Sequence, residues 1–189
     1  MLISDSHKFT FFHFPKTAGS AITAALAPIL RNPKSVVLGP KWQLRHHVDS
    51  YQHHPVSDCG VPHGYFKASF VRNPFEIVVS TWDQKTSFEE FVVTKVVPRQ
   101  VTAAKWSQYE YLTYNGQLQV DFVGRYENLQ KDFDKFCFLV RVPKKQIKMI
   151  NESKGKRHYR EYYNPKTRGI VASMYADDLK YFGYTYCHG

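Results

Sequence analysis

The first strongly apolar segment of the chain, residues 9–14, predicts a buried strand. It is rich in phenylalanine, which favours β structure, and Pro15 ends it. Residues 20–30 are rich in Ala, Leu and Ile and predict a helix, which Asn32 and Pro33 close. The chain therefore opens with a strand, a tight loop and a helix.

Further along, short apolar segments again alternate with stretches of helical spacing. The predicted strands are 65–71 and 120–124, and the predicted helices are 75–85, 129–140 and 166–181. Pro74 suits the first turn of a helix, and Gly183 suits a helix end. Ser87, with Glu90 three residues on, predicts a capping box that opens another helix. This alternation predicts an α/β fold with a largely parallel sheet.

The organisation of the chain predicts one domain over residues 1–189. No internal repeat or low-complexity linker divides it, and the length suits a single core. Residues 34–63 are rich in Pro, Gly and His and have little periodicity. A loop of this length inside a compact domain is usually functional or mobile.

Charge narrows the class of ligand. The 26 Lys and Arg residues outnumber the 16 Asp and Glu residues, which gives a net charge of +10. Such an excess attracts anions, including nucleotide phosphates, acidic sugars, nucleic acids and acidic membranes. Charge therefore indicates the sign of the ligand and leaves its identity open.

The cysteines and the lengths of the apolar segments indicate the cellular compartment of the protein. Cys59, Cys137 and Cys187 form no CxxC pair, so we expect neither a disulfide framework nor a zinc cluster. Cys137 lies in an apolar stretch and is expected in the core. No long apolar segment opens the chain, and no run approaches the roughly 18 to 20 apolar residues that span a bilayer. The sequence thus predicts a soluble, cytoplasmic protein.

The loop at residues 15–20 is the first candidate anion site. It lies between a predicted strand and a helix N-terminus, where unpaired N–H groups and the helix dipole favour negative charge. Gly19 permits close approach of the backbone, Thr17 and Ser20 add hydroxyls, and Lys16 adds a cation. The Walker A spacing is absent, and from spacing alone an ordinary strand-to-helix turn remains possible.

Residues 14–22 resemble the Pro-Lys-Thr-Gly-Gly-Thr-Ser loop of the family-2, carbohydrate-type sulfotransferases. Ala18 and Ser20 depart from that pattern, and Ser20 keeps the hydroxyl. Enzymes of this family use 3′-phosphoadenosine 5′-phosphosulfate (PAPS) and release PAP. We therefore expect a P-loop-like three-layer domain with a central, mostly parallel sheet flanked by helices. The resemblance implies that the 5′-phosphosulfate is held by Pro15, Lys16, Thr17, Ala18, Gly19, Ser20 and Ala21.

A second block, residues 70–75 followed by Ser80, resembles the family's Val-Arg-Asp/Asn-Pro segment and its Ser. The resemblance implies that Arg72 and Ser80 bind the 3′-phosphate of the donor. The physics agrees, because Ser80 lies eight positions on, about two helical turns, and Arg offers bidentate contacts to phosphate. A surface Arg and a capping Ser are the alternative.

Other stretches continue the resemblance over residues 10–184, and one of them adds Arg125 to the donor-binding residues. These stretches are 87–92, 120–129, 159–163, 175–178 and 181–184. Each motif is moderately specific on its own. Their occurrence in the family's order is the stronger signal.

Sulfuryl transfer needs a base for the acceptor hydroxyl and cations for the charge that develops. We expect Lys16 to stabilise the negative charge on the sulfuryl group and the leaving phosphate. Of the nine histidines, the resemblance favours His47 as the base, and His47 aligns better than His46 with the residues that follow. An imidazole suits proton abstraction near neutral pH.

Acceptor contacts are assigned to His46, Lys156 and Arg157, the last two from a short basic run. His53, His54 and His63 are weaker candidates for the base. The histidines lack carboxylate or Cys partners at fixed offsets, so no metal is predicted.

The sequence thus predicts transfer of a sulfuryl group from PAPS to a hydroxyl, and the carbohydrate nature of the acceptor rests on the resemblance alone. One alternative is a P-loop-like nucleotide-dependent phosphotransferase or kinase, which would need an acid for Mg²⁺ and a Walker Lys-Ser/Thr pair. Others are a catalytically degenerate PAP-binding domain and a basic nucleic-acid-binding domain. Scattered charges argue against a nucleic-acid partner.

Overall fold

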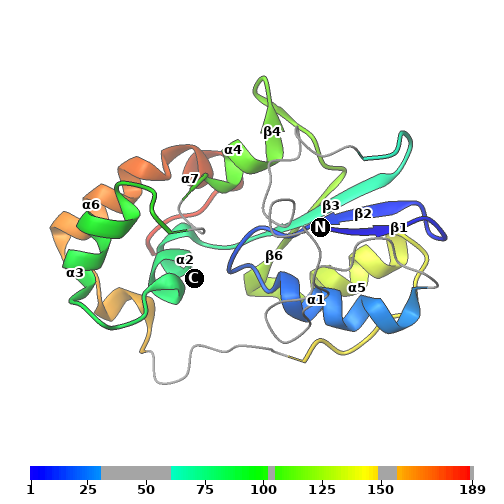
Figure 1. The fold of residues 1–189 in the computed structure, drawn as a ribbon, viewed down its shortest axis with the longest axis horizontal. Helices are drawn as coiled ribbons and strands as arrows, with labels where there is room; N and C mark the ends of the chain where they lie inside the picture. Colours follow the sequence, from blue (N-terminus) through cyan, green and yellow to red (C-terminus); the bar gives the residue numbers. More distant parts are fainter. Residues whose placement is uncertain (31–60, 102–104, 149–156, 188–189) are drawn as a thin grey trace. The chain divides into compact units, whose positions relative to one another are not determined.

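The computed structural model describes residues 1–30, 61–101, 105–148 and 157–187 (Figure 1). The chain divides into two compact units. One comprises Met1–Val71 and Tyr111–Ile150, and the other Arg72–Glu110 and Asn151–Gly189. That the whole of 1–189 forms a single domain stays a prediction.

The first unit is built on a four-stranded sheet in the order β1-β2-β3-β6. Its strands are β1 (Leu2–Ser4), β2 (Phe9–Phe12), β3 (Phe66–Val71) and β6 (Phe122–Arg125). β2, β3 and β6 run parallel, and β1 pairs antiparallel with β2. The predicted mostly parallel α/β sheet is confirmed. β1 was not predicted, because three residues are too few to carry a periodic signal.

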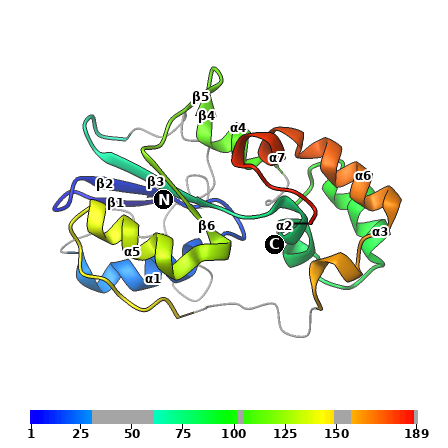
Figure 2. The same cartoon turned by 180° about the vertical axis from the view of Figure 1, so that it is seen from behind.

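Two helices, α1 (Gly19–Leu26) and α5 (Leu129–Leu139), lie side by side along the sheet (Figures 1 and 2). Phe9 of β2 meets Phe136 of α5 edge-to-face, with ring centroids 5.3 Å apart. Cys137 is fully buried here, as expected, and burial raises its thiol pKa to about 11. α1 is shorter than predicted because Pro28 has no N–H to donate to the helix.

A small hairpin, β4 (Thr113–Tyr114) and β5 (Gln117–Leu118), also belongs to this unit. Its turn is Asn115-Gly116, and both residues have positive φ, 50° and 75°. Asn-Gly between short strands is the typical signature of such a turn, although these two-residue strands are too short to show a periodic pattern.

The second unit is helical in its described residues. Its elements include α2 (Pro74–Thr81), α3 (Phe88–Phe91) with a π-helical continuation over Val92–Val96, α6 (Pro165–Met174) and α7 (Ala176–Phe182). α4 (Gln108–Leu112) crosses the boundary between the two units. Buried side chains of α2, α3 and α6 form one core, in which Phe75, Phe88 and Tyr163 meet edge-to-face.

Several predicted helix ends can be compared with this unit. Pro74 occupies the first turn of α2, and the Ser87 hydroxyl accepts from the Glu90 N–H at 3.2 Å, as expected. Gly183 ends α7 with φ 68°. A single helix over 166–181 is wrong, because Tyr175 breaks it with φ −114° and ψ 28°. The break places the Tyr175 side chain in the core, which outweighs the helical spacing of the sequence.

Candidate functional site

The loop between β2 and α1 has the backbone geometry of an anion-binding turn. Lys16 and Ala18 have positive φ, 67° and 62°, and Thr17 between them does not. Alternation of this kind turns successive N–H groups toward one concavity, a geometry found in phosphate sites. The loop leads directly into the N-terminus of α1, which favours negative charge.

The side chains of this loop divide into buried and accessible ones. Lys16 is exposed, and Ser20 is half-buried, so both have access to a ligand. Thr17 is fully buried and donates its hydroxyl proton to the Phe14 carbonyl at 2.8 Å. The Thr17 hydroxyl therefore closes the turn, and a contact of Thr17 with the donor stays a prediction. Pro15 is buried too.

His13 packs against the start of α1, a contact that sequence reasoning missed. Its side chain is 6% exposed, and a Cβ added at Gly19 would lie 1.9 Å from the His13 ring. Gly19 is thus required by the close approach of an imidazole. Tyr111 supports the same segment, because its hydroxyl donates to the His13 carbonyl at 3.4 Å and its ring meets that of Phe14.

Gly19→Ala is expected to lower the free energy of unfolding by about 1 to 3 kcal/mol, the usual cost of overpacking. The added methyl group would overlap the buried His13 ring. Urea denaturation measures the change. Gly169→Ala in α6 is the matched control, because nothing lies within 4 Å of a Cβ there. That control should be stabilised by about 0.5 to 1 kcal/mol. Equal stabilisation of both variants would contradict the His13–Gly19 contact.

The parallel strands place the carboxyl ends of β2, β3 and β6 at one edge of the sheet. Val71, the last residue of β3, is in register with Arg125, the last residue of β6. The Arg125 backbone N–H donates to the Asp132 carboxylate at 2.7 Å, which fixes the start of α5 against this strand end. Ligands of open α/β sheets bind outside this edge.

Arg72 follows β3 directly and lies at the start of the second unit. Its side chain is 16% exposed and forms an ion pair with Glu76, four residues on. The Nε and Nη2 atoms of Arg72 donate to one Glu76 oxygen at 3.0 and 2.8 Å. The backbone of Arg72 is held as well, since its N–H donates to Gln108 Oε1 and its carbonyl accepts from Gln108 Nε2, at 2.7 and 2.8 Å.

Ser80 lies on α2, as expected, two turns after Arg72. It is half-buried, and its hydroxyl donates to the Ile77 carbonyl at 3.0 Å. A serine hydroxyl rotates readily, so this intrahelical bond is exchangeable for one to a ligand.

Of the residues proposed as the base or as acceptor contacts, only some lie in the described part of the chain. His46, His47 and Lys156 lie outside the described residues. Arg157 is exposed and forms an ion pair with Glu161 at 3.1 Å. Among the described residues there is no cluster of His, Cys, Asp and Glu able to hold a metal ion. In the same ranges, every helix is too short or too polar to span a bilayer.

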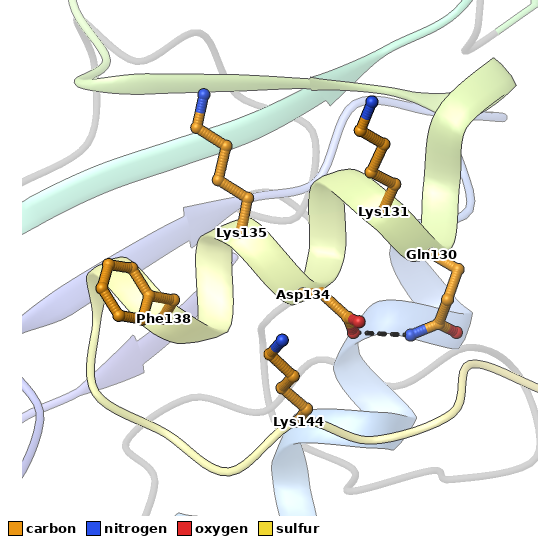
Figure 3. A pocket seen from close by; sticks show the side chains of 6 residues that line it. All are labelled: Gln130, Lys131, Asp134, Lys135, Phe138 and Lys144. Carbon is orange, nitrogen blue, oxygen red and sulfur yellow. Dashed lines mark hydrogen bonds between the residues drawn. The ribbon is translucent and has the colours of Figure 1, made fainter.

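A basic hollow lies on α5 and contains none of the residues assigned to the donor (Figure 3). Its lysines are Lys131, Lys135 and Lys144, and a hydrogen bond of 2.8 Å joins Gln130 to Asp134 within it. Phe138 at its rim is 75% exposed. The hollow is therefore a surface feature of α5 and of the segment that follows it, and it includes no residue of the loop before α1.

Comparison with known proteins identifies the family of this chain. A model of the sulfotransferase family matches residues 1–185. The chain belongs to the sulfotransferase family. An uncharacterized protein of Archaeoglobus fulgidus is 32% identical over 96 residues, which are 47% of this chain and 78% of that protein. No solved structure matches.

Membership of the sulfotransferase family supports sulfuryl transfer as the general reaction of this chain. The match covers residues of both compact units, including the loop before α1 and Arg72. The family-2 resemblance drawn from the sequence motifs is confirmed.

Proposed function

We propose that this sulfotransferase transfers the sulfuryl group of PAPS to a hydroxyl group of a carbohydrate, on a P-loop-like three-layer fold. The observation that carries the proposal is the loop before α1, where alternating φ signs and a helix N-terminus combine with an exposed lysine. Such a loop suits a phosphate or phosphosulfate group. The carbohydrate acceptor rests on the family resemblance.

The loop is proposed to bind the 5′-phosphosulfate through its backbone N–H groups, Lys16 and Ser20. Lys16 is exposed, so its ammonium group has access to the transferring sulfuryl group and to the oxygen that leaves with PAP. A cation at this oxygen lowers the barrier because it meets charge that develops in the transition state. Thr17 and Gly19 serve the shape of the loop, the first by closing the turn and the second by admitting His13.

The 3′-phosphate is proposed to bind Arg72 and Ser80, and Arg125 to add a further donor contact. A guanidinium group offers paired N–H donors to phosphate oxygens. Its ion pair with Glu76 already restricts the Arg72 side chain, so less conformational entropy is lost when a phosphate binds. Recognition of this second phosphate is what would distinguish PAPS from ATP.

His47 is proposed to take the proton of the acceptor hydroxyl, and His46, Lys156 and Arg157 to contact the acceptor. When bound, PAPS supplies the sulfuryl group. Removal of the hydroxyl proton makes the acceptor oxygen a better nucleophile, and a nearby imidazole performs that step at neutral pH. The basic residues suit an acceptor that carries acidic groups.

Calorimetry of the full chain with three ligands tests this function. We expect PAP to bind more tightly than ATP–Mg²⁺, and a short DNA duplex to bind weakly and lose affinity steeply with salt. A preference for ATP–Mg²⁺ would indicate a phosphotransferase, and a preference for the duplex would indicate a nucleic-acid-binding domain. Tight PAP binding with no sulfuryl transfer would indicate a degenerate PAP-binding domain.

A further inference from the structure

Gln108 holds the backbone of Arg72 with both ends of its side-chain amide. Oε1 accepts from the Arg72 N–H at 2.7 Å, and Nε2 donates to the Arg72 carbonyl at 2.8 Å. Gln108 is fully buried and lies 36 residues along the chain from Arg72. This contact resembles the pairing of two neighbouring strands, and it fixes both backbone polar groups of the residue that follows β3.

Asp178 fixes the orientation of this amide. Its Oδ2 atom accepts from the Gln108 backbone N–H at 3.0 Å and from Gln108 Nε2 at 3.1 Å, and its Oδ1 atom accepts from the Tyr109 N–H at 2.6 Å. A carboxylate beside one end of an amide requires the NH₂ group at that end. The oxygen of Gln108 must therefore face the Arg72 N–H.

Asp178 holds the first turn of α4 with a buried carboxylate, and burial of this charge lowers the free energy of unfolding. Asp178 is fully buried, and burial raises its pKa to about 6, although the N–H groups of Tyr109 and Gln108 oppose this rise. At neutral pH its charge is therefore kept at the expense of stability. Buried ionisable groups with shifted pKa values are typical of functional sites, where side chains are held in place for a ligand.

Other contacts hold the same short segment. The Asn73 side chain donates to the Thr185 carbonyl at 3.1 Å, and the Tyr163 hydroxyl donates to the Phe75 carbonyl at 3.0 Å. The C-terminal part of the chain therefore fixes the two residues that flank Pro74. Together with the Gln108 contact, these bonds hold the backbone from which the Arg72 side chain reaches its ion pair with Glu76.

We propose that Gln108 and Asp178 are positioning residues for recognition of the donor's 3′-phosphate: Asp178 orients Gln108, and Gln108 sets the backbone of Arg72. This inference rests on the proposed function, in which Arg72 contacts that phosphate. A guanidinium group recognises a phosphate well only when the backbone of its arginine is held within a fraction of an ångström. Neither residue is proposed to contact the donor itself.

Gln108→Met tests the proposal, because Met keeps the length of the side chain and removes both the acceptor oxygen and the NH₂ group of the amide. Calorimetry would compare PAP with adenosine 5′-monophosphate (AMP), which lacks the 3′-phosphate. We expect the affinity for PAP to fall about 10- to 100-fold, the usual effect of removing a residue that orients a ligand-contacting side chain. The affinity for AMP should change less than about twofold. Gln100→Met, at an exposed glutamine of the same unit, is the matched control and should change neither affinity.

Asp178→Asn is a milder second variant, in case Gln108→Met fails to fold. An Asn side chain has one acceptor oxygen in place of two, so at least one N–H of Gln108 or Tyr109 loses its partner. We expect a smaller loss of PAP affinity in the same direction, again with AMP unchanged. Equal weakening of both ligands in the folded variants would show a structural role only and overturn the proposal, as would unchanged PAP binding.

The wild-type protein separates this inference from the proposed function. If it binds PAP no better than AMP, the proposed function fails first. If it prefers PAP and Arg72→Ala removes that preference, the proposed function stands. Retention of the preference in the Gln108 and Asp178 variants would then overturn only the positioning role.

Discussion

His47→Ala is expected to leave PAP binding unchanged and to lower turnover about 100- to 10,000-fold, the range that a general base contributes. The imidazole is proposed to remove the proton of the acceptor hydroxyl, a step that PAP binding does not involve. Turnover would be followed as PAP release from PAPS with an oligosaccharide acceptor that supports wild-type activity. Calorimetry with PAP would show that the variant still binds the donor product.

His46→Ala is the matched control for this experiment, because it removes an imidazole from the adjacent position. It is assigned to the acceptor, so we expect a higher KM for the acceptor and a kcat that falls far less than in His47→Ala. Full turnover in His47→Ala would remove His47 from the mechanism. Loss of kcat in the His46 variant alone would transfer the role of base to His46.

Arg72→Ala is expected to weaken PAP binding about 100-fold or more, which corresponds to about 3 kcal/mol. The substitution removes the charge and the paired donors proposed for the 3′-phosphate, and it leaves Glu76 without its ion-pair partner. AMP should bind the variant and the wild-type protein with similar affinity. Calorimetry with both ligands at fixed ionic strength measures the difference.

Arg157→Ala provides a control that matches Arg72→Ala in chemistry. Arg157 also forms an ion pair with a Glu four residues on, at 3.1 Å, but its side chain is 68% exposed. We expect no change in its PAP affinity, because Arg157 is assigned to the acceptor. Similar losses in the two variants would mean that PAP responds to general positive charge. Loss of AMP binding in Arg72→Ala would contradict a specific contact with the 3′-phosphate.

Local sequence patterns predicted the elements that carry the proposed donor site. The aromatic run before Pro15 and the Ala-rich stretch after it predicted β2, the loop and α1, with ends that differ by a few residues from those observed. Pro74 and Ser87 marked the starts of α2 and α3. These signals are local, because proline and a capping hydroxyl act within one helical turn.

Elements without a local signal were missed or misjudged. β1 is only three residues long, and its partner is β2, which makes it a consequence of pairing. The break at Tyr175 is contrary to the helical spacing on either side, because burial of that ring in the core of the second unit decides the backbone there. Short-range propensity is routinely overridden by such packing.

The α/β alternation, the candidate anion-binding loop and the family resemblance could be predicted from the sequence, since they depend on residues close together in the chain. Three features follow from tertiary contacts: Gly19 admits the His13 ring, the Thr17 hydroxyl bonds within the loop, and Asp178 holds Gln108, which in turn holds Arg72. The partners in that last contact are 36 and 70 residues apart. No spacing rule reaches across such separations, because folding brings the segments together through cores formed by many residues at once.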